Sequence, residues 1–260
     1  LFRSCYDGRL LSHIQNLPHI KGLRLNQVNE DALNYTSQNF KSLDVLILND
    51  PKLIQIPSGV SKFTALRQIE VYCLGLTYLN TPLSALENVE VMKIMTGKVQ
   101  QLDFTFNALQ KLRFLSITGL TSFFKFPKEI FKAKNIVELH LDIRTAHPVP
   151  NEISELINLR VLGLHECQLV RKMPDSLYLC KRLEEIYLSD ANYMANVNVL
   201  NKIDHPFKLL MNRCEYVDIA KDIAPNKNLK AIVIPASTTP RIINKLNEIM
   251  TEERVQLKDF

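Results

Sequence analysis

Three polar residues, Asp142, His165 and Ser189, follow one another at intervals of 23 and 24 residues and have the side-chain types of a hydrolase triad. In such a triad the histidine activates the serine, backbone donors form an oxyanion hole, and a pocket excludes water. Whether the chain forms the oxyanion hole and the pocket depends on the secondary-structure elements that carry Asp142, His165 and Ser189. The residue types alone therefore leave a hydrolase as a remote alternative.

Metal-ligand side chains gather in the same part of the chain, at His140, Asp142, His165 and Glu166. Their spacing matches no established ligand motif. The five cysteines lie far apart in the sequence, at Cys5, Cys73, Cys167, Cys180 and Cys214. Because no CxxC pair is present, a zinc ribbon and a dense disulfide scaffold are both disfavoured. We therefore predict neither a metal ion nor a cofactor.

The composition is that of an ordinary globular chain, with 260 residues of which 46% are hydrophobic and 23% charged. The 32 basic residues are scattered among 27 acidic ones without a basic block, which argues against a nucleic-acid partner. No apolar run approaches the roughly 18 residues of a membrane span. Arg3, Asp7 and Arg9 interrupt the first apolar residues, so no secretory signal is visible and a cytoplasmic location is favoured over a secreted or surface one.

A repeated pattern organises the chain: an apolar residue, two others, an apolar residue, one other, and an apolar residue. It occurs at 19–25, 42–48, 65–71, 88–94, 111–117, 135–141, 158–164, 182–188 and 228–234. Successive copies are 23 or 24 residues apart, except for a last interval of 46 that contains a weak copy with Leu209 and Met211 in frame. Apolar residues at alternate positions predict one short strand in each repeat, with one side facing a core.

A second apolar segment follows several of these strands and begins at a proline. The four prolines are Pro57, Pro127, Pro150 and Pro174. Proline is tolerated in the first turn of a helix, where its missing N–H is not needed. We expect a short helical segment there, whose apolar side faces the same core as the strand.

With about ten such units, the sequence resembles the leucine-rich repeat family over essentially its whole length. The variant is similar to that of plant intracellular immune receptors and related bacterial and animal proteins. The resemblance implies an α/β fold: a curved leucine-rich repeat solenoid with a parallel β-sheet on the concave face and short helices and turns on the convex face. Stacking would bury the apolar side that one repeat alone leaves exposed.

One column departs from the family pattern. The family usually has asparagine three residues after the last strand leucine. This chain instead has Val28, Pro51, Leu74, Gly97, Leu120, Arg144, Cys167, Ala191, Cys214 and Ser237. We expect Cys167 and Cys214 to fill the buried corner that asparagine normally takes, and Cys180 to replace a core leucine.

The two ends differ in character. Residues 1–236 are predicted to form the repeats, beginning inside one, with Phe2 at the last strand position. We therefore expect an upstream domain of the same polypeptide. Residues 237–260 are predicted to form a capping helix and tail, because Ile242, Ile243 and Leu246 recur at helical spacing after Pro240.

The strand residues that point away from the core should share one face, and their types change along the chain. Early positions are largely apolar: Val45, Ile47, Tyr72, Val91, Met95 and Phe114. Later ones are acidic, histidine or tyrosine: Glu138, His140, Asp142, His165, Glu166, Glu185, Tyr187 and Asp190. Apolar area beside a charged zone is typical of a protein-binding surface.

The preferred interpretation is a non-catalytic recognition module that binds a protein or peptide on its concave face. By resemblance, it would be the sensing part of a larger receptor. A bacterial secreted or surface protein that binds host proteins or glycans is the alternative. We expect no enzymatic activity, no nucleic-acid partner and no membrane span.

Overall fold

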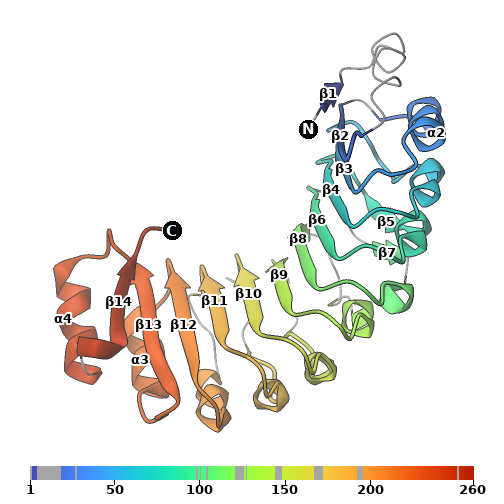
Figure 1. Cartoon of the computed structure of the whole chain (residues 1–260). Helices are drawn as coiled ribbons and strands as arrows, with labels where there is room; N and C mark the ends of the chain where they lie inside the picture. Colours follow the sequence, from blue (N-terminus) through green and yellow to red (C-terminus); the bar gives the residue numbers. More distant parts are fainter. Residues whose placement is uncertain are drawn as a thin grey trace. The chain divides into compact units, whose positions relative to one another are not determined.

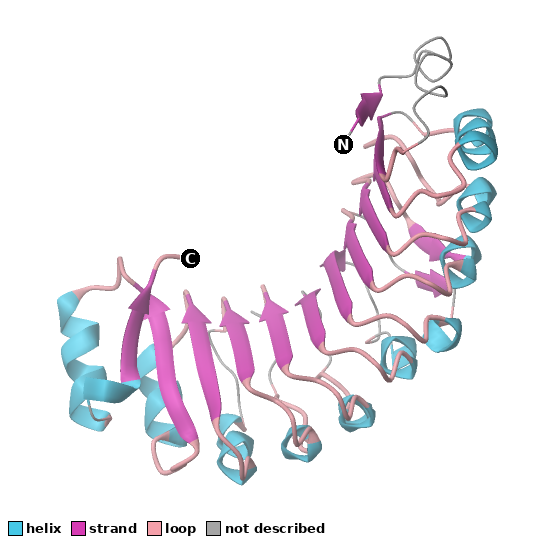
Figure 2. Ribbon diagram, in the orientation of Figure 1, coloured by secondary structure: helices cyan, strands magenta, loops and turns pink. Residues whose placement is uncertain are grey.

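The computed structural model describes residues 2–4, 19–26, 28–97, 99, 101–103, 105–120, 126, 128–143, 148–166, 172–191, 196–250 and 252–260. The chain divides into two compact units. Unit 1 comprises residues 1–123 and 129–136, and unit 2 comprises residues 124–128 and 137–260. Within each unit, a row of parallel strands lies on one side and a row of short helices on the other (Figures 1 and 2).

In its described residues, unit 1 contains six parallel strands side by side. In spatial order they are β1 (Phe2–Ser4), β2 (Gly22–Asn26), β3 (Val45–Asn49), β4 (Gln68–Tyr72), β6 (Val91–Met95) and β8 (Phe114–Leu120). The helical side carries α2 (Glu30–Asn39), η1 (Ser58–Lys62), η2 (Thr81–Ala85), η3 (Phe106–Ala108) and η4 (Lys128–Lys132), which belongs to unit 1 from Glu129 onward. The strands β5 (Tyr78–Asn80) and β7 (Gln101–Asp103) form a separate two-stranded sheet.

In its described residues, unit 2 also contains six parallel strands side by side. They are β9 (Glu138–Ile143), β10 (Val161–His165), β11 (Glu185–Ser189), β12 (Phe207–Asn212), β13 (Leu229–Pro235) and β14 (Val255–Lys258). Its helical elements are η5 (Asn151–Glu155), η6 (Leu177–Leu179), η7 (Val197–Lys202), α3 (Tyr216–Ile223), α4 (Pro240–Ile249) and η8 (Glu252–Arg254). The weak repeat around Leu209 forms β12, so the period predicts this strand correctly.

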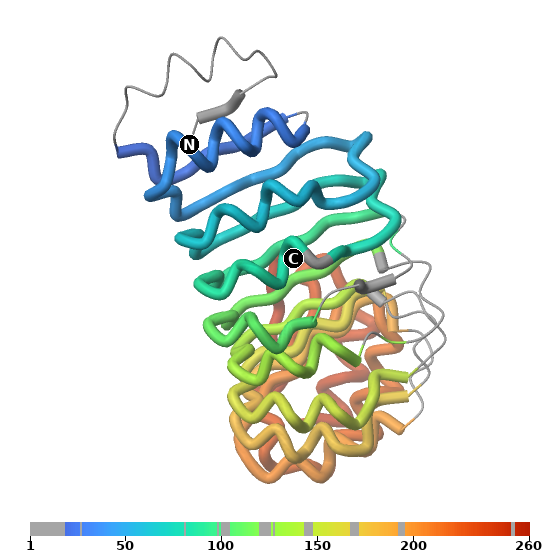
Figure 3. Tube along the Cα trace, turned by 90° about the vertical axis from the view of Figure 1, so that its right-hand side faces the viewer, coloured from blue at the N-terminus to red at the C-terminus, as the bar shows by residue number. Residues whose placement is uncertain are grey.

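The pairing register of the parallel strands places equivalent residues of successive repeats beside one another. Val45 pairs with Gln68, and Gln68 with Val91, so equivalent residues 23 positions apart lie side by side. Each repeat is one turn of the chain (Figure 3). The first interval is an exception, because Phe2 pairs with Leu23 and not with Leu25. The predicted place of Phe2 at the last strand position is therefore wrong by two residues, since this interval is 21 residues long.

Alternation along each strand separates the core from the open face. In β10, Leu162 and Leu164 are fully buried, and the helical side contributes the buried Ile153. Burying one such side chain stabilises the fold by about 1.5–3 kcal/mol. Val161 and His165 alternate with the two leucines and are partly exposed. We call the side of the strands opposite the helices the sheet face.

Proline begins two of the helical segments as predicted, whereas Pro174 lies before η6, whose N-cap is Ser176. Pro57 and Pro150 are the N-cap residues of η1 and η5, each a five-residue 3-10 helix. Pro127 lies outside the described residues. The period gives no sign of the longer helix α2, which Asn29 caps by accepting a hydrogen bond from the backbone N–H of Ala32 at 2.8 Å.

Different side chains form hydrogen bonds to the backbone in the corners that follow the strands. Cys214 donates its thiol proton to the carbonyl of Asn212, and Asp50 accepts a hydrogen bond from the backbone N–H of Val28 at 2.8 Å. The first residue of the corner has positive φ at Gly119 (84°), Glu166 (50°), Asp190 (56°) and Arg213 (50°). The corner geometry thus recurs although its residue type does not. The predicted corner residue Cys167 lies outside the described residues.

Candidate functional site

The sheet face of β9, β10 and β11 brings polar side chains together. The register aligns His140 with Gly163 and Gly163 with Tyr187. It also aligns Asp142 with His165. Because neighbouring strands are about 4.8 Å apart, these side chains can interact directly across the sheet.

The two histidines form the centre of this arrangement. His140 Nδ1 and His165 Nε2 are 3.0 Å apart, and His140 Nε2 is 2.7 Å from Glu138 Oε1. Burial is the first cause that lowers the pKa of His165, and the neighbouring His140 lowers it further. At neutral pH His165 is therefore held in its uncharged form.

Gly163 makes this arrangement possible. A Cβ atom at position 163 would lie 2.7 Å from His165 Nε2, 2.9 Å from His140 Cε1 and closer still to His140 Nδ1. Any larger residue would push the rings apart. Gly163 is thus a site residue that the repeat pattern does not reveal, although the register places it in the same column as His140.

Tyr187 links the histidines to a second carboxylate and to apolar residues. Its hydroxyl donates a hydrogen bond to Glu185 Oε2 at 2.8 Å, and its ring centroid lies 5.8 Å from that of His140. Burial and then Glu185 raise the pKa of Tyr187 to about 12, so it stays protonated. On its other side Tyr187 packs against a buried apolar group on β12 and β13: Leu210, Ala231 and Val233.

We call Glu138, His140, His165, Glu185 and Tyr187 the imidazole cluster. All five were among the residues predicted for binding. Among the described residues, only one oxygen of each of its two carboxylates accepts a hydrogen bond. Lys208 of β12 lies opposite Glu185 in the register.

The acidic residues at the ends of these strands are less available. Asp190 is buried, and its Oδ2 accepts from Arg213 Nη2 at 2.8 Å and from the Ser189 hydroxyl at 3.3 Å. Glu166 donates its backbone N–H to Ser189 Oγ at 3.1 Å. Asp142 is also buried. The proton of Ser189 is therefore directed to Asp190, whereas a serine hydrolase needs it directed to a histidine.

In unit 1 the predicted apolar residues occupy the sheet face to different degrees. Met95 is 44% exposed, Ile47 is only 8% exposed, and Val45, Tyr72, Val91 and Phe114 are partly exposed.

A buried carboxylate on the unit 1 sheet face was missed by the sequence analysis. Glu70 accepts hydrogen bonds from Tyr72 at 2.7 Å and Gln68 at 2.8 Å, and it pairs with Lys93 at 3.2 Å. Burial alone would raise the pKa of Glu70, but these three partners together hold it below its usual value. The signal was available, because Glu70 and Lys93 are 23 residues apart and the period places them side by side.

Other candidate chemistry finds no support in the part of the chain that the structure describes. No group of three or more His, Cys, Asp and Glu side chains is placed to hold a metal ion. Burial raises the pKa of Cys73 and Cys214 to about 11 and that of Cys180 to about 12, which disfavours the reactive thiolate. Within the same residues, no helix is long and apolar enough to span a bilayer.

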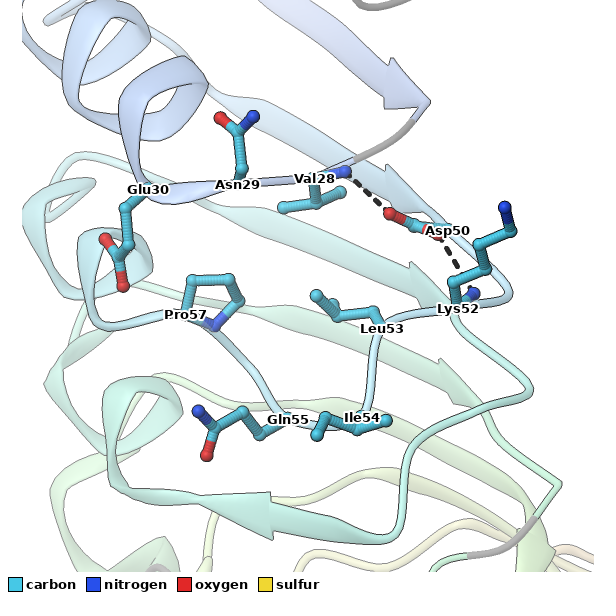
Figure 4. A pocket seen from close by; sticks show the side chains of 9 residues that line it. All are labelled: Val28, Asn29, Glu30, Asp50, Lys52, Leu53, Ile54, Gln55 and Pro57. Carbon is cyan, nitrogen blue, oxygen red and sulfur yellow. Dashed lines mark hydrogen bonds between the residues drawn. The ribbon is translucent and has the colours of Figure 1, made fainter.

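A pocket of about 320 Å³ opens beside α2 in unit 1 (Figure 4). Val28, Leu53 and Pro57 give it apolar walls. Two carboxylates line it, Glu30 and Asp50. Glu30 accepts from the backbone N–H groups of Ser58 and Gly59. Asp50 accepts from the backbone N–H groups of Val28 at 2.8 Å and Lys52 at 2.9 Å, shown as dashed lines. Both carboxylates thus organise the backbone around the pocket, and the imidazole cluster remains the better candidate site.

Comparison with known proteins rests on structure alone. No protein-family model matches the sequence, and no curated protein matches it. A leucine-rich repeat protein of Leptospira interrogans is similar with a TM-score of 0.56 and 17% identity, over 94% of this chain and 68% of that one. The leucine-rich repeat domain of the type III effector XopL gives 0.52 and 14%, over 95% and 79%.

A third similar structure is TLR13 in its complex with ssRNA13, with a TM-score of 0.58 and 17% identity, over 95% of this chain and 33% of that one. At these identities the likeness establishes the fold and not the function. Together with the 23-residue register of the parallel strands, it shows that this chain has the leucine-rich repeat fold.

Proposed function

We propose that the chain is a non-catalytic recognition module that binds a protein or peptide on the sheet face of unit 2. The observation that supports this most is the imidazole cluster, which is ordered by its own hydrogen bonds on an open sheet. A site whose side chains are already fixed loses less conformational entropy when a partner binds.

The chemistry of the face favours a partner segment with a basic residue next to an apolar one. Glu138 and Glu185 each retain a carboxylate oxygen for a lysine or arginine, and Tyr187 with Leu210 and Val233 offers adjoining apolar contact. Such carboxylates would repel phosphate groups. This argues for a protein partner here, although the similar TLR13 structure holds RNA.

This role suits two settings. The module could be the sensing part of a larger receptor with an upstream domain, or a secreted or surface protein that contacts host proteins. Catalysis by Asp142, His165 and Ser189 is disfavoured, because the Ser189 hydroxyl is directed to Asp190.

Selection from a random peptide display library tests the proposal without a known partner. We expect enriched peptides to combine lysine or arginine with an apolar residue, and to lose at least about tenfold affinity for the double variant Glu138→Lys/Glu185→Lys, as for loss of a charge-assisted hydrogen bond. Asp218→Lys/Asp222→Lys on α3 makes the same charge change on the helical side and serves as the control. Equal binding to both double variants would contradict the proposal.

A further inference from the structure

The geometry of the two histidines identifies the bond between them. Their ring planes differ by 17°, their centroids are 5.3 Å apart, and the facing nitrogens are 3.0 Å apart. The two separations differ by 2.3 Å (5.3 minus 3.0), which is about the centroid-to-nitrogen distance of the two rings together. Both nitrogens therefore lie on the line between the centroids, and the rings meet edge to edge in nearly one plane.

This in-line arrangement fits a shared proton and not a metal ion. A metal bound in line between two histidine nitrogens would need bonds of about 2.0–2.1 Å each, hence nitrogens about 4 Å apart. At 3.0 Å only a hydrogen fits between His140 Nδ1 and His165 Nε2. The pair is thus an N–H···N hydrogen bond.

The surrounding acceptor fixes the direction of that bond. An ionised Glu138 can only accept, so His140 donates from Nε2 to it. A neutral His140 then presents Nδ1 as an acceptor, and His165 must donate from its own Nε2. Both rings therefore carry their proton on Nε2.

A second positive charge cannot be accommodated in this arrangement. When the pair takes up one proton, a single hydrogen still lies between the facing nitrogens. When it takes up a second proton, both facing nitrogens carry a hydrogen, and the two N–H groups point at each other across 3.0 Å. The charged and titratable groups around the pair in unit 2 are Glu138 and Asp142 on β9, Glu166 after β10, and Glu185 and Tyr187 on β11. The carboxylates stabilise the first added charge, while burial and the in-line contact oppose the second.

We propose that the His140–His165 pair makes the sheet face of unit 2 acid-sensitive: on acidification the second proton breaks the N–H···N bond and His165 turns away from His140. His165 is the ring that moves, because His140 is anchored by Glu138 at 2.7 Å and flanked by Tyr187, whereas His165 is the last residue of β10.

The added charge offsets that of Glu138 and Glu185, so a basic partner would be released at low pH. This last consequence rests on the proposed function. The titration itself does not.

Nitrogen NMR of the whole chain labelled with ¹⁵N-histidine tests the inference without any partner. We expect both rings as Nε2–H tautomers above the histidine range, and two titration steps more than about one pH unit apart. Gly163→Ala should separate the rings and merge the steps toward the ordinary value of about 6.5.

Three outcomes would overturn the inference: an Nδ1–H tautomer on His140, a single common step for both rings, or a Gly163→Ala titration equal to that of the original chain. If the Gly163→Ala protein folds poorly, His165→Gln is used in its place to check that the two titration steps belong to the His140–His165 pair. His205→Gln is its matched control. If selected peptides bind equally well above and below the histidine range, acid release is refuted while the proposed function stands. If no peptide is selected, the proposed function fails while the titration is still decisive.

Discussion

Two glycines on neighbouring parts of the repeat, Gly119 and Gly163, should respond very differently to alanine. At Gly119, φ is +84°, and a Cβ atom would lie 2.6 Å from the carbonyl carbon of Thr96 and closer to its oxygen. At Gly163 the three atoms nearest to the Cβ atom would all belong to imidazole rings. Backbone cannot move aside without disturbing the sheet, whereas a side chain can change its rotamer.

The structure gives the size of each effect. For Gly119→Ala, the left-handed conformation costs about 1–2 kcal/mol, and forcing a methyl group into packed backbone costs about 1–3 kcal/mol more. The expected loss is therefore about 2–5 kcal/mol, a large part of the typical 5–15 kcal/mol of a domain. For Gly163→Ala we expect about 0.5–1.5 kcal/mol, the cost of displacing a side chain from its rotamer.

Equilibrium unfolding in urea, followed by far-ultraviolet circular dichroism, measures both values. Both substitutions add the same methyl group. The difference between their losses of unfolding free energy therefore reports the surroundings of the added methyl group, which are backbone at Gly119 and imidazole rings at Gly163. A Gly119→Ala protein as stable as the Gly163→Ala protein would refute the assignment of Gly119 as a position that requires glycine.

Three further predictions concern the fold and its ionisable groups. Glu30 accepts hydrogen bonds from the backbone N–H groups of Ser58 at 2.7 Å and Gly59 at 3.0 Å, so Glu30→Ala should lose about 1 kcal/mol in urea unfolding, and Asp31→Ala in the same turn should lose less. Glu70 has a lowered pKa in the folded chain, so its stabilisation should be present above the unfolded value of 4.5 and be lost as pH falls through the folded value. Unfolding at several pH values should show this loss, and a Glu70→Gln protein with an equally steep acid dependence would contradict it. The buried Cys73 and Cys180 and the half-buried Cys214, with pKa values of about 11, 12 and 11, should resist iodoacetamide at pH 8 until urea unfolds the chain. Their early modification in a peptide map would contradict these raised pKa values.

Much of the fold follows from the period of the sequence. Alternate apolar residues such as Leu162 and Leu164 place the strand, its buried side and its neighbours, because a parallel stack repeats one register. Cys180 was expected in the core and is fully buried there. The 23-residue period predicts the wrong register for β1, where the interval shortens to 21 residues. It also does not predict the length of α2.

The candidate site was only partly predictable. The column positions of His140, His165 and Tyr187 follow from the repeat, and so does their common face. Their bonds do not, because ring orientation depends on rotamers and on the space that Gly163 leaves. Asp190 was expected as an acidic contact residue, and only the structure reveals that it is buried against Arg213.

The most direct test of the central claim is to map where a selected peptide binds. Amide and side-chain NMR shifts of the labelled chain should change on β9, β10 and β11 when the peptide is added, with the largest changes at His140, His165 and Tyr187. Changes confined to the helical side of unit 2, or to unit 1, would contradict recognition on the sheet face.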